Sequence, residues 1–216
     1  MPRLDERLKT VARQIRSATH ADIGSDHGHL LVALIKAGRI QTGIAVENKV
    51  LPLENSRRSL CRLAADVRFG DGLDVIEAGE IDSLSICGLG GKRIVEILGK
   101  HPARVPDLVV LQPNKRADLV RRWAFESGFH LRDEICTPGP KPFVILRCGR
   151  NSEVPDPVYQ GLRLEDAWMF GPVFLKQNLS ELRIQLREER RYLVQLNRLG
   201  DFNQRRLEAI ERVLAW

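Results

Sequence analysis

Short apolar segments, each followed by glycine or polar residues, recur along residues 1–150 and alternate with segments of helical periodicity. The expected strands lie just before Asp22 and over residues 43–46, 67–69, 81–87, 108–111, 129–135 and 143–148. The expected helices cover residues 4–15, 30–35, 53–65, 92–98 and 117–127. Strands that alternate with helices predict an α/β fold, in which a largely parallel sheet carries helices on both faces.

Glycine-rich or polar motifs follow five of these expected strands. In chain order they are Asp22-Ile23-Gly24-Ser25-Asp26-His27-Gly28, Glu47, Gly70-Asp71-Gly72, Gly88-Leu89-Gly90-Gly91 and Gln112-Pro113-Asn114. In open α/β sheets, ligands bind beyond the carboxyl ends of the strands, near the point where the strand order reverses. The motifs therefore predict one functional site along this edge, and each motif is expected to end its strand.

The first motif combines two glycines with two carboxylates. Glycines permit a sharp turn and a close approach to a ligand, but the carboxylates would repel a pyrophosphate. They favour a ligand with hydroxyls, an ammonium or a sulfonium, although the run taken alone also fits a plain tight turn. Glu47 adds an acceptor for both hydroxyls of a ribose. Together these residues favour an adenosine cofactor without phosphate, and S-adenosylmethionine is the obvious candidate.

The formal net charge is +6, and all of this excess falls within residues 1–150, because residues 151–216 hold ten basic and ten acidic side chains. A polyanionic partner is therefore expected to meet the N-terminal part. The sequence has no membrane-length apolar run and no signal-peptide segment at its start, so a cytoplasmic location is expected. Four dispersed cysteines match no zinc spacing, which predicts buried thiols and no metal: Cys61, Cys87, Cys136 and Cys148.

Residues 151–157 are expected to link a first domain, residues 1–150, to a second domain, residues 158–216. In the second domain, leucines recur with heptad-like spacing at Leu175, Leu179, Leu182, Leu186, Leu193 and Leu196. Gly200 and Asp201 can end one helix and begin the next. The pattern predicts an antiparallel helical hairpin or coiled coil, through which two copies could form a homodimer. The alternative is that these helices pack on the first domain.

The same motifs in this order, with Phe170-Gly171-Pro172 near the start of the helical part, resemble those of the bacterial tRNA (adenine-N1)-methyltransferases of the TrmK type. The resemblance extends over essentially the whole chain. It implies a class I, Rossmann-like methyltransferase domain followed by a C-terminal helical coiled coil. It also implies methyl transfer from S-adenosylmethionine to N1 of adenine 22 in tRNA.

The resemblance assigns roles to the motif residues position by position. It implies that the cofactor is bound by Asp22, Gly24, Ser25, Asp26, His27, Gly28, Glu47, Asn48, Asp71, Gly72, Gly88 and Gln112. The candidate catalytic residues are Asp26, Gly90 and Asn114. Adenine N1 carries a lone pair, so no general base is needed, and Asp26 is expected to stabilise the cationic product. His29 stands where the family usually has an aromatic residue.

Four basic residues after Asn114 allow two interpretations. They form either a solvated helix face or a set of phosphate contacts next to the site: Lys115, Arg116, Arg121 and Arg122. Alternatives to the leading function also stay open. They are a methyltransferase acting on another RNA or a small molecule, an RNA-binding protein whose site no longer does chemistry, and a coiled-coil interaction protein.

Overall fold

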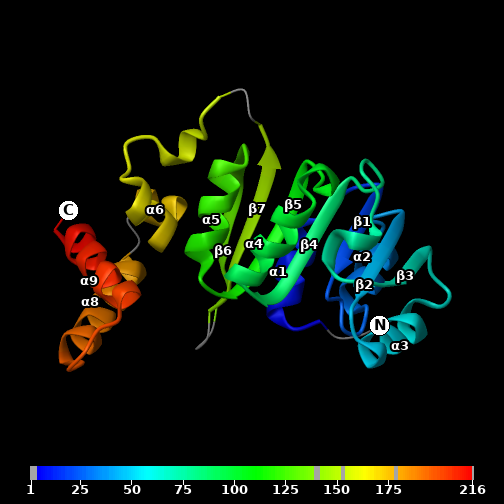
Figure 1. Ribbon diagram of the computed structural model, residues 1–216, viewed down its shortest axis with the longest axis horizontal. Coiled ribbons are helices and arrows are strands. Elements are labelled where there is room, and N and C mark those ends of the chain that lie inside the picture. The colour runs from blue at the N-terminus through cyan, green and yellow to red at the C-terminus, as the bar shows by residue number, and fades with distance from the viewer. Residues whose placement is uncertain (1–3, 139–141, 152–153, 178–179, 216) are drawn as a thin grey trace. The chain divides into compact units, whose positions relative to one another are not determined.

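The computed structural model describes residues 4–138, 142–151, 154–177 and 180–215, and its contacts divide the chain into two compact units, Met1–Pro155 and Asp156–Trp216. The first unit contains a seven-stranded sheet with the order β3-β2-β1-β4-β5-β7-β6 (Figure 1). Its strands are β1 (Thr19–Ile23), β2 (Thr42–Glu47), β3 (Ala65–Phe69), β4 (Ser83–Gly90), β5 (Leu108–Lys115), β6 (Phe129–Cys136) and β7 (Val144–Arg150).

Strands β1 to β5 pair in parallel, whereas β7 is antiparallel to both β5 and β6. The strand order reverses between β1 and β4, because the chain passes outward from β1 to β2 and β3 and then returns to β4. The predicted α/β fold with a largely parallel sheet is confirmed. The reversal also identifies the carboxyl ends of β1 and β4 as the edge where a ligand is expected.

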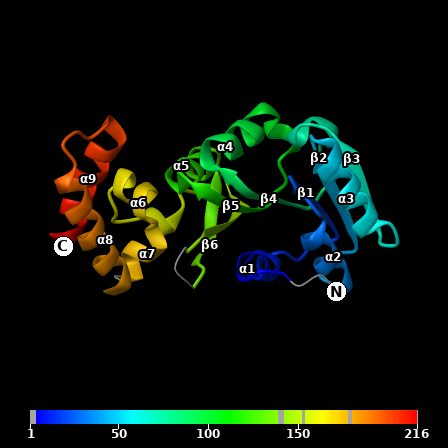
Figure 2. The same ribbon diagram turned by 90° about the horizontal axis from the view of Figure 1, so that it is seen from below.

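Helices cover both faces of the sheet, as expected. Figure 2 shows α1 (Glu6–Gln14) and α2 (His29–Lys36) on one side and α4 (Gly91–Lys100) and α5 (Ala117–Glu126) on the other. Leu60 of α3 (Val50–Leu60) joins Val11 and Leu31 in a core that also contains Ala45 and Val110 of the sheet. Burial of these apolar side chains is the main favourable term in folding. Two short 3₁₀ helices, η1 (Gly72–Val75) and η2 (Pro102–Arg104), complete this unit.

The predicted ends of the strands β4 and β5 are wrong, because the motifs after them belong to the strands. β4 continues to Gly90 and β5 to Lys115, and Leu89 pairs with Pro113 in this added part. The pairing shifts register here, and Gly88 has a φ of +77°. Glycine allows such an irregularity within a strand, so the motifs shape the strand ends instead of stopping them.

The predicted bounds of α3 are also wrong, since the helix begins and ends several residues earlier than expected. No side-chain cap marks its start at Lys49, and a turn from Leu60 to Leu63 precedes β3. The sequence therefore held no local signal for the position of its first turn.

The second unit is helical and contains η3 (Pro157–Tyr159), α6 (Leu164–Phe170), α7 (Pro172–Gln177), α8 (Ser180–Gln195) and α9 (Asp201–Leu214). α8 and α9 form an antiparallel hairpin, in which Glu189 pairs with Arg206 and Arg190 pairs with Glu211. Gly200 is the N-cap of α9. The predicted helical hairpin is present.

The structure describes only part of the predicted leucine pattern. Leu175 lies on α7, and Leu179 lies outside the described residues. On α8, Leu186 and Leu193 are buried within the unit. Gly171, with a φ of +97°, ends α6 and turns the chain directly before α7. This turn precedes the first leucine of the pattern, and the coiled coil itself stays a prediction.

The cysteine prediction is partly wrong, because Cys61 and Cys136 are exposed, whereas Cys148 is buried. All four cysteines are free. Over the described ranges, no helix is long and apolar enough to cross a membrane. In the same ranges, no three His, Cys, Asp or Glu side chains gather as a metal-binding group.

Candidate active site

The loop between β1 and α2 turns the chain sharply at the carboxyl edge of the sheet. Gly24, Asp26 and Gly28 have φ values of +73°, +59° and +68°. A Cβ on Gly24 would meet no atom within 4 Å, so the loop is open to a ligand at this residue. A Cβ on Gly28 would lie 3.0 Å from Leu60, which explains the glycine there by packing. Asp26 adopts a left-handed conformation that is uncommon outside glycine and often marks functional sites.

Glu47, the last residue of β2, holds this loop against the sheet. Its carboxylate accepts a hydrogen bond from the main-chain N–H of Asp26, and only 4% of the residue is exposed. Burial raises the pKa of Glu47 to about 7, and the nearby Asp22 and Asp26 carboxylates add to this shift. A buried carboxyl group with a shifted pKa, beside an open loop, is typical of a binding or catalytic site.

Asp22 lies within β1, so the expectation that the strand ends before it is wrong. The residue is buried and accepts a 2.6 Å hydrogen bond from Ser85 Oγ of β4. Ser85 Oγ lies 2.9 Å from His20 Nε2, and His20 Nδ1 lies 2.7 Å from Ser83 Oγ. A buried hydrogen-bonded chain therefore runs from Asp22 down β1 and β4. Burial raises the pKa of Asp22 and lowers that of His20 to about 3, which leaves the imidazole neutral.

A cavity of about 100 Å³ opens beside Gly24. It is lined by Ile23, Gly24, Val46, Asn48, Gly70, Asp71, Gly72, Leu89, Arg93 and Ile97. On its wall, Asp71 accepts hydrogen bonds from Arg93 at 2.6 Å and from Asn48 at 3.3 Å. The Arg93 guanidinium holds the pKa of Asp71 below its usual range. A Cβ on Gly72 would lie 2.8 Å from Ile97, so a larger residue would close this cavity wall.

The ends of β4 and β5 carry a network of amide hydrogen bonds. Buried Gln112 accepts at Oε1 from Arg7 Nη1 at 2.7 Å and from the Gly88 N–H at 3.0 Å. Gln112 Nε2 donates to Asn114 Oδ1 at 3.1 Å, and Asn114 Nδ2 donates to the Gly88 carbonyl at 2.6 Å. Asn114 is exposed and Gly90 is partly buried, so the outer side of this network is accessible to a substrate.

The side chains of Asp26 and His27 face solvent, with exposed fractions of 69% and 50%. Asp26 Oδ2 lies 3.6 Å from His27 Nε2, and the His27 ring stacks on His29 with centroids 5.2 Å apart. The fold thus brings the main chain of Asp26 into contact with Glu47 and leaves its carboxylate accessible. His29 lies at the start of α2.

The structure brings two groups of predicted residues together and adds two arginines that the sequence analysis missed. Arg7 lies on α1 and Arg93 on α4, so neither belongs to a glycine-rich motif. The periodicity of residues 4–15 indicated a basic face on the first helix. It gave no signal that Arg7, in particular, would turn toward the sheet and contact Gln112.

Both interpretations of the basic segment after Asn114 are wrong for Arg121. This residue is 3% exposed and forms a 2.6 Å ion pair with Glu134 of β6. Arg116 and Arg122, by contrast, pair with Asp118 and Glu126 near the surface.

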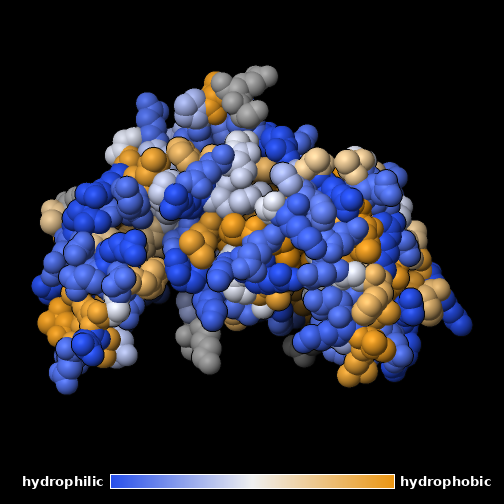
Figure 3. Space-filling view, viewed as in Figure 1, coloured by the Kyte–Doolittle hydropathy of each residue, from blue (hydrophilic) through white to orange (hydrophobic). Residues whose placement is uncertain are grey.

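Exposed apolar residues lie next to the site motifs, and the sequence analysis did not single them out. Val50 and Leu51 follow Asn48 closely in the chain, and Phe69 directly precedes Gly70. Figure 3 shows hydrophobic surface over α3, which begins with Val50. Exposed apolar side chains beside a cavity can pack against a flat ring.

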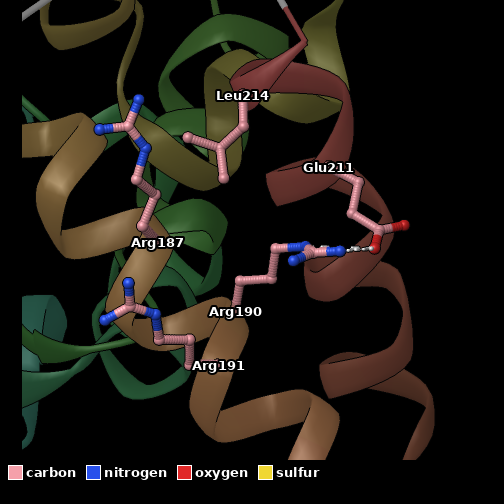
Figure 4. Close-up of a pocket in the computed structure, with 5 residues that line it drawn as sticks. All are labelled: Arg187, Arg190, Arg191, Glu211 and Leu214. Atoms are coloured by element: carbon pink, nitrogen blue, oxygen red, sulfur yellow. Dashed lines mark hydrogen bonds and ion pairs between the residues drawn. The ribbon is translucent and has the colours of Figure 1, made fainter.

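The second unit has a cavity of its own, of about 470 Å³, lined by Arg187, Arg190, Arg191, Glu211 and Leu214. Figure 4 shows Arg190 reaching from α8 toward Glu211 of α9, and the two groups lie 3.3 Å apart. Within the described part of the chain, Arg187 and Arg191 have no ion-pair partner. These two guanidinium groups are available to an anion.

Comparison with known proteins agrees with this architecture. A family model described as a methyltransferase domain matches residues 4–146. The crystal structure of the Bacillus subtilis m1A22 tRNA methyltransferase TrmK superposes with a TM-score of 0.86 at 27% identity, covering 99% of this chain and 100% of that chain. A Streptococcus pneumoniae structure described as a putative tRNA (m1A22) methyltransferase in complex with S-adenosyl-L-methionine shares the fold, with a TM-score of 0.82 at 24% identity over 98% of this chain and 100% of its own.

The tRNA (adenine(22)-N(1))-methyltransferase of Bacillus subtilis (strain 168) is 34% identical over 196 residues, which cover 83% of this chain and 82% of that protein. The match is far longer than any one of the motifs at the sheet edge. The resemblance seen in the sequence is confirmed, and the chain belongs to the family of tRNA (adenine(22)-N(1))-methyltransferases.

Proposed function

We propose that this protein transfers a methyl group from S-adenosylmethionine to N1 of an adenine in tRNA, the adenine at position 22. The observation that carries the proposal is the contact between Glu47 and the main chain of Asp26, beside the open Gly24, in a chain of this family. An acceptor next to open backbone suits the hydroxyls of a ribose. The target nucleotide is taken from the name of the Bacillus subtilis relative.

The residues present fit S-adenosylmethionine. Ser25 Oγ is buried and forms no hydrogen bond among the residues that the structure describes, although it lies close enough to Asp22 to lower that carboxyl's pKa. A buried polar atom of this kind is most simply explained by a ligand that is hydrogen-bonded when present. The cavity of about 100 Å³ is smaller than typical ligand pockets of roughly 300 Å³ or more, so it accommodates part of the cofactor.

Bound S-adenosylmethionine supplies an electrophilic methyl group on a sulfonium centre. Glu47 and Asn48 would hold its ribose, and Asp71 and Gly72 would lie against its adenine. Asp22 of β1 and the loop residues Gly24, Ser25, His27 and Gly28 would hold the methionine end. Carboxylates on this loop favour a cationic ligand by simple electrostatics.

The remaining candidate residues lie toward the target base. Catalysis rests mainly on positioning, because adenine N1 already carries its lone pair. The Asp26 carboxylate would stabilise the positive charge that develops on the base, and Asn114 would offer an amide to the base edge. Gly90 leaves space for the ring. A base that is paired or stacked in tRNA must first leave its stack to reach this edge.

The partner tRNA is supported by the charge of the chain and by the names of its relatives. The basic excess of residues 1–150 lies in the unit that contains the site. The proposal includes the cytoplasmic location expected from the sequence, where tRNA is found. A homodimer formed through the C-terminal helices stays a prediction; the exposed Ile184, Tyr192 and Val194 of α8 are the residues that would support it.

The proposal is tested with pure protein, labelled S-adenosylmethionine and unmodified bulk tRNA, followed by nucleoside mass spectrometry. We expect label in 1-methyladenosine, and no label in a transcript whose adenine 22 is replaced by guanine. Cofactor binding without transfer to any tRNA would reject the proposed substrate.

The alternative substrates differ in their response to salt. A tRNA methyltransferase should lose substrate affinity steeply as salt rises, because phosphate contacts release counterions. A small-molecule methyltransferase should show little such loss of substrate affinity. A protein that fails to bind S-adenosylmethionine at all would instead favour an RNA-binding or interaction role.

A further inference from the structure

Arg7 reaches from α1 to the amide network at the ends of β4 and β5. Its Nη1 donates to Gln112 Oε1 at 2.7 Å, and its side chain is 22% exposed. The guanidinium carbon also lies 5.8 Å from the centroid of the Phe143 ring, within cation–π range. We propose that Arg7 is a positioning residue for the methyl transfer, which orients the Asn114 amide toward the target base. This inference rests on the proposed function.

Arg7 fixes the direction in which the Gln112 amide faces. An arginine side chain only donates hydrogen bonds, so it can bind this amide only through Oε1. The Gly88 N–H donates to the same oxygen at 3.0 Å. The amide nitrogen of Gln112 therefore faces Asn114. Because Gln112 is fully buried, reversing its amide would leave donors facing donors, at the cost of unsatisfied polar groups.

The direction of the Gln112 amide determines that of Asn114. Gln112 Nε2 donates to Asn114 Oδ1, so Asn114 Nδ2 is the group that donates to the Gly88 carbonyl. One acceptor position on Asn114 Oδ1 is left for a substrate. Adenine carries an amino donor next to N1, which matches this acceptor. A reversed Asn114 amide would instead present N–H groups to that amino group.

The positive charge of Arg7 also lowers the pKa of Asp22 and so favours its ionised carboxylate, against the larger effect of burial. An effect of Arg7 on activity could therefore arise on the cofactor side or on the base side. It could also arise if Arg7 merely fastened α1 to the domain. The test must separate these three roles.

The test compares Arg7→Met, which keeps the length of the side chain, with Arg7→Lys, which keeps the charge and a donor. We expect Arg7→Met to lower kcat for tRNA methylation by roughly tenfold or more, the order expected for a lost hydrogen bond to a charged group. The Kd for S-adenosylmethionine and the Tm should stay close to those of the wild-type protein. Arg7→Lys should recover part of kcat. Arg13→Met, on an exposed position of the same helix, is the matched control and should match the wild type.

A double-mutant cycle with Asn114→Ala shows whether Arg7 acts through Asn114. We expect Arg7→Met to have little further effect on kcat once Asn114 is alanine. The inference would be overturned if Arg7→Met lowered kcat by the same factor with and without Asn114→Ala. It would also be overturned if the loss of activity were accounted for by weaker S-adenosylmethionine binding or by a lower Tm. Full kcat in Arg7→Met, with an active wild type, would overturn the inference alone. A wild-type protein that transfers no methyl group would overturn the proposed function as well.

Discussion

Glu47 is a carboxyl group whose ionisation is set by its surroundings. Its pKa of about 7 lies above the ordinary value of 4.5, so folding without ligand favours the protonated form. The stability that this group contributes is complete below about pH 4.5 and is lost as the pH rises through about 7. We expect Glu47→Gln to become more stable relative to the wild type across this range, as measured by urea unfolding.

The same residue should make cofactor binding depend on pH. An ionised Glu47 is the better acceptor for ribose hydroxyls, so the affinity for S-adenosylmethionine should rise as the pH passes through about 7. In Glu47→Gln, calorimetry should find weaker binding that no longer varies in this way. Glu54→Gln, at an exposed position of α3, is the control and should behave as the wild type. An unchanged pH dependence in Glu47→Gln would assign the titration to another group.

Asp26 combines two roles in different atoms, which makes a clean substitution possible. Its main-chain N–H contacts Glu47, whereas its carboxylate is exposed. Asp26→Asn keeps the main-chain contact and tolerates positive φ, because asparagine also adopts that conformation. We expect a loss of kcat with little change in cofactor affinity. Retention of the full turnover rate would exclude a role for this charge in stabilising the product.

At the level of single residues, the sequence best predicts those site residues whose type is required by the conformation or charge of their own loop. The glycines and acids of the first loop stand out because few other residues allow such turns and charges. Arg7 and Arg93 do not stand out, because their roles depend on where α1 and α4 lie on the sheet. The roles of the predicted site residues stay predictions until ligand binding is measured.

At the level of elements, apolar periodicity predicts most helices and strands, because burial governs both. It fails at the ends of β4 and β5, where pairing between the strands extends them through glycine and proline. The decisive interaction there is the pairing of two strands, whereas a local pattern treats each strand separately.

The buried ion pair between Arg121 of α5 and Glu134 of β6 gives a prediction about stability at the level of elements. Glu134→Ala would leave the Arg121 charge buried without its carboxylate, at a cost of about 3–5 kcal/mol. Glu126→Ala removes an exposed partner of Arg122 and should cost about 0–1 kcal/mol. Urea unfolding curves of both variants measure the difference. Equal losses would mean that the Arg121–Glu134 pair is solvated.

At the level of the whole molecule, the two units differ in charge. The basic excess lies in residues 1–150, yet Arg187 and Arg191 of the neutral second part lack ion-pair partners among the residues that the structure describes. Net charge, which is all that a composition gives, therefore does not reveal two neighbouring arginines that lack ion-pair partners in the described part of the chain. The antiparallel hairpin places these arginines on one side of α8, and the sequence analysis did not identify them.

If these arginines contact tRNA phosphates, removing them should weaken tRNA binding without affecting the cofactor. For Arg187→Gln with Arg191→Gln, we expect the slope of log affinity against log salt to become shallower by roughly one unit for each lost phosphate contact. Arg198→Gln with Arg205→Gln, at exposed positions of the same unit, removes the same charge as a control. Identical slopes in both double variants would show that only net charge matters.

The buried hydrogen-bonded chain from Asp22 to Ser83 provides a way to observe the ionisation of Asp22. Ser85 has one proton, which it gives to an ionised Asp22, so it must receive one from His20 Nε2. The neutral ring then accepts from Ser83 at Nδ1. If Asp22 takes up a proton, the direction of the hydrogen bonds along the chain can reverse, and the other tautomer of His20 becomes possible. The tautomer of His20, read from its ¹⁵N resonances, therefore reports the ionisation of a carboxylate to which the ring is not bonded.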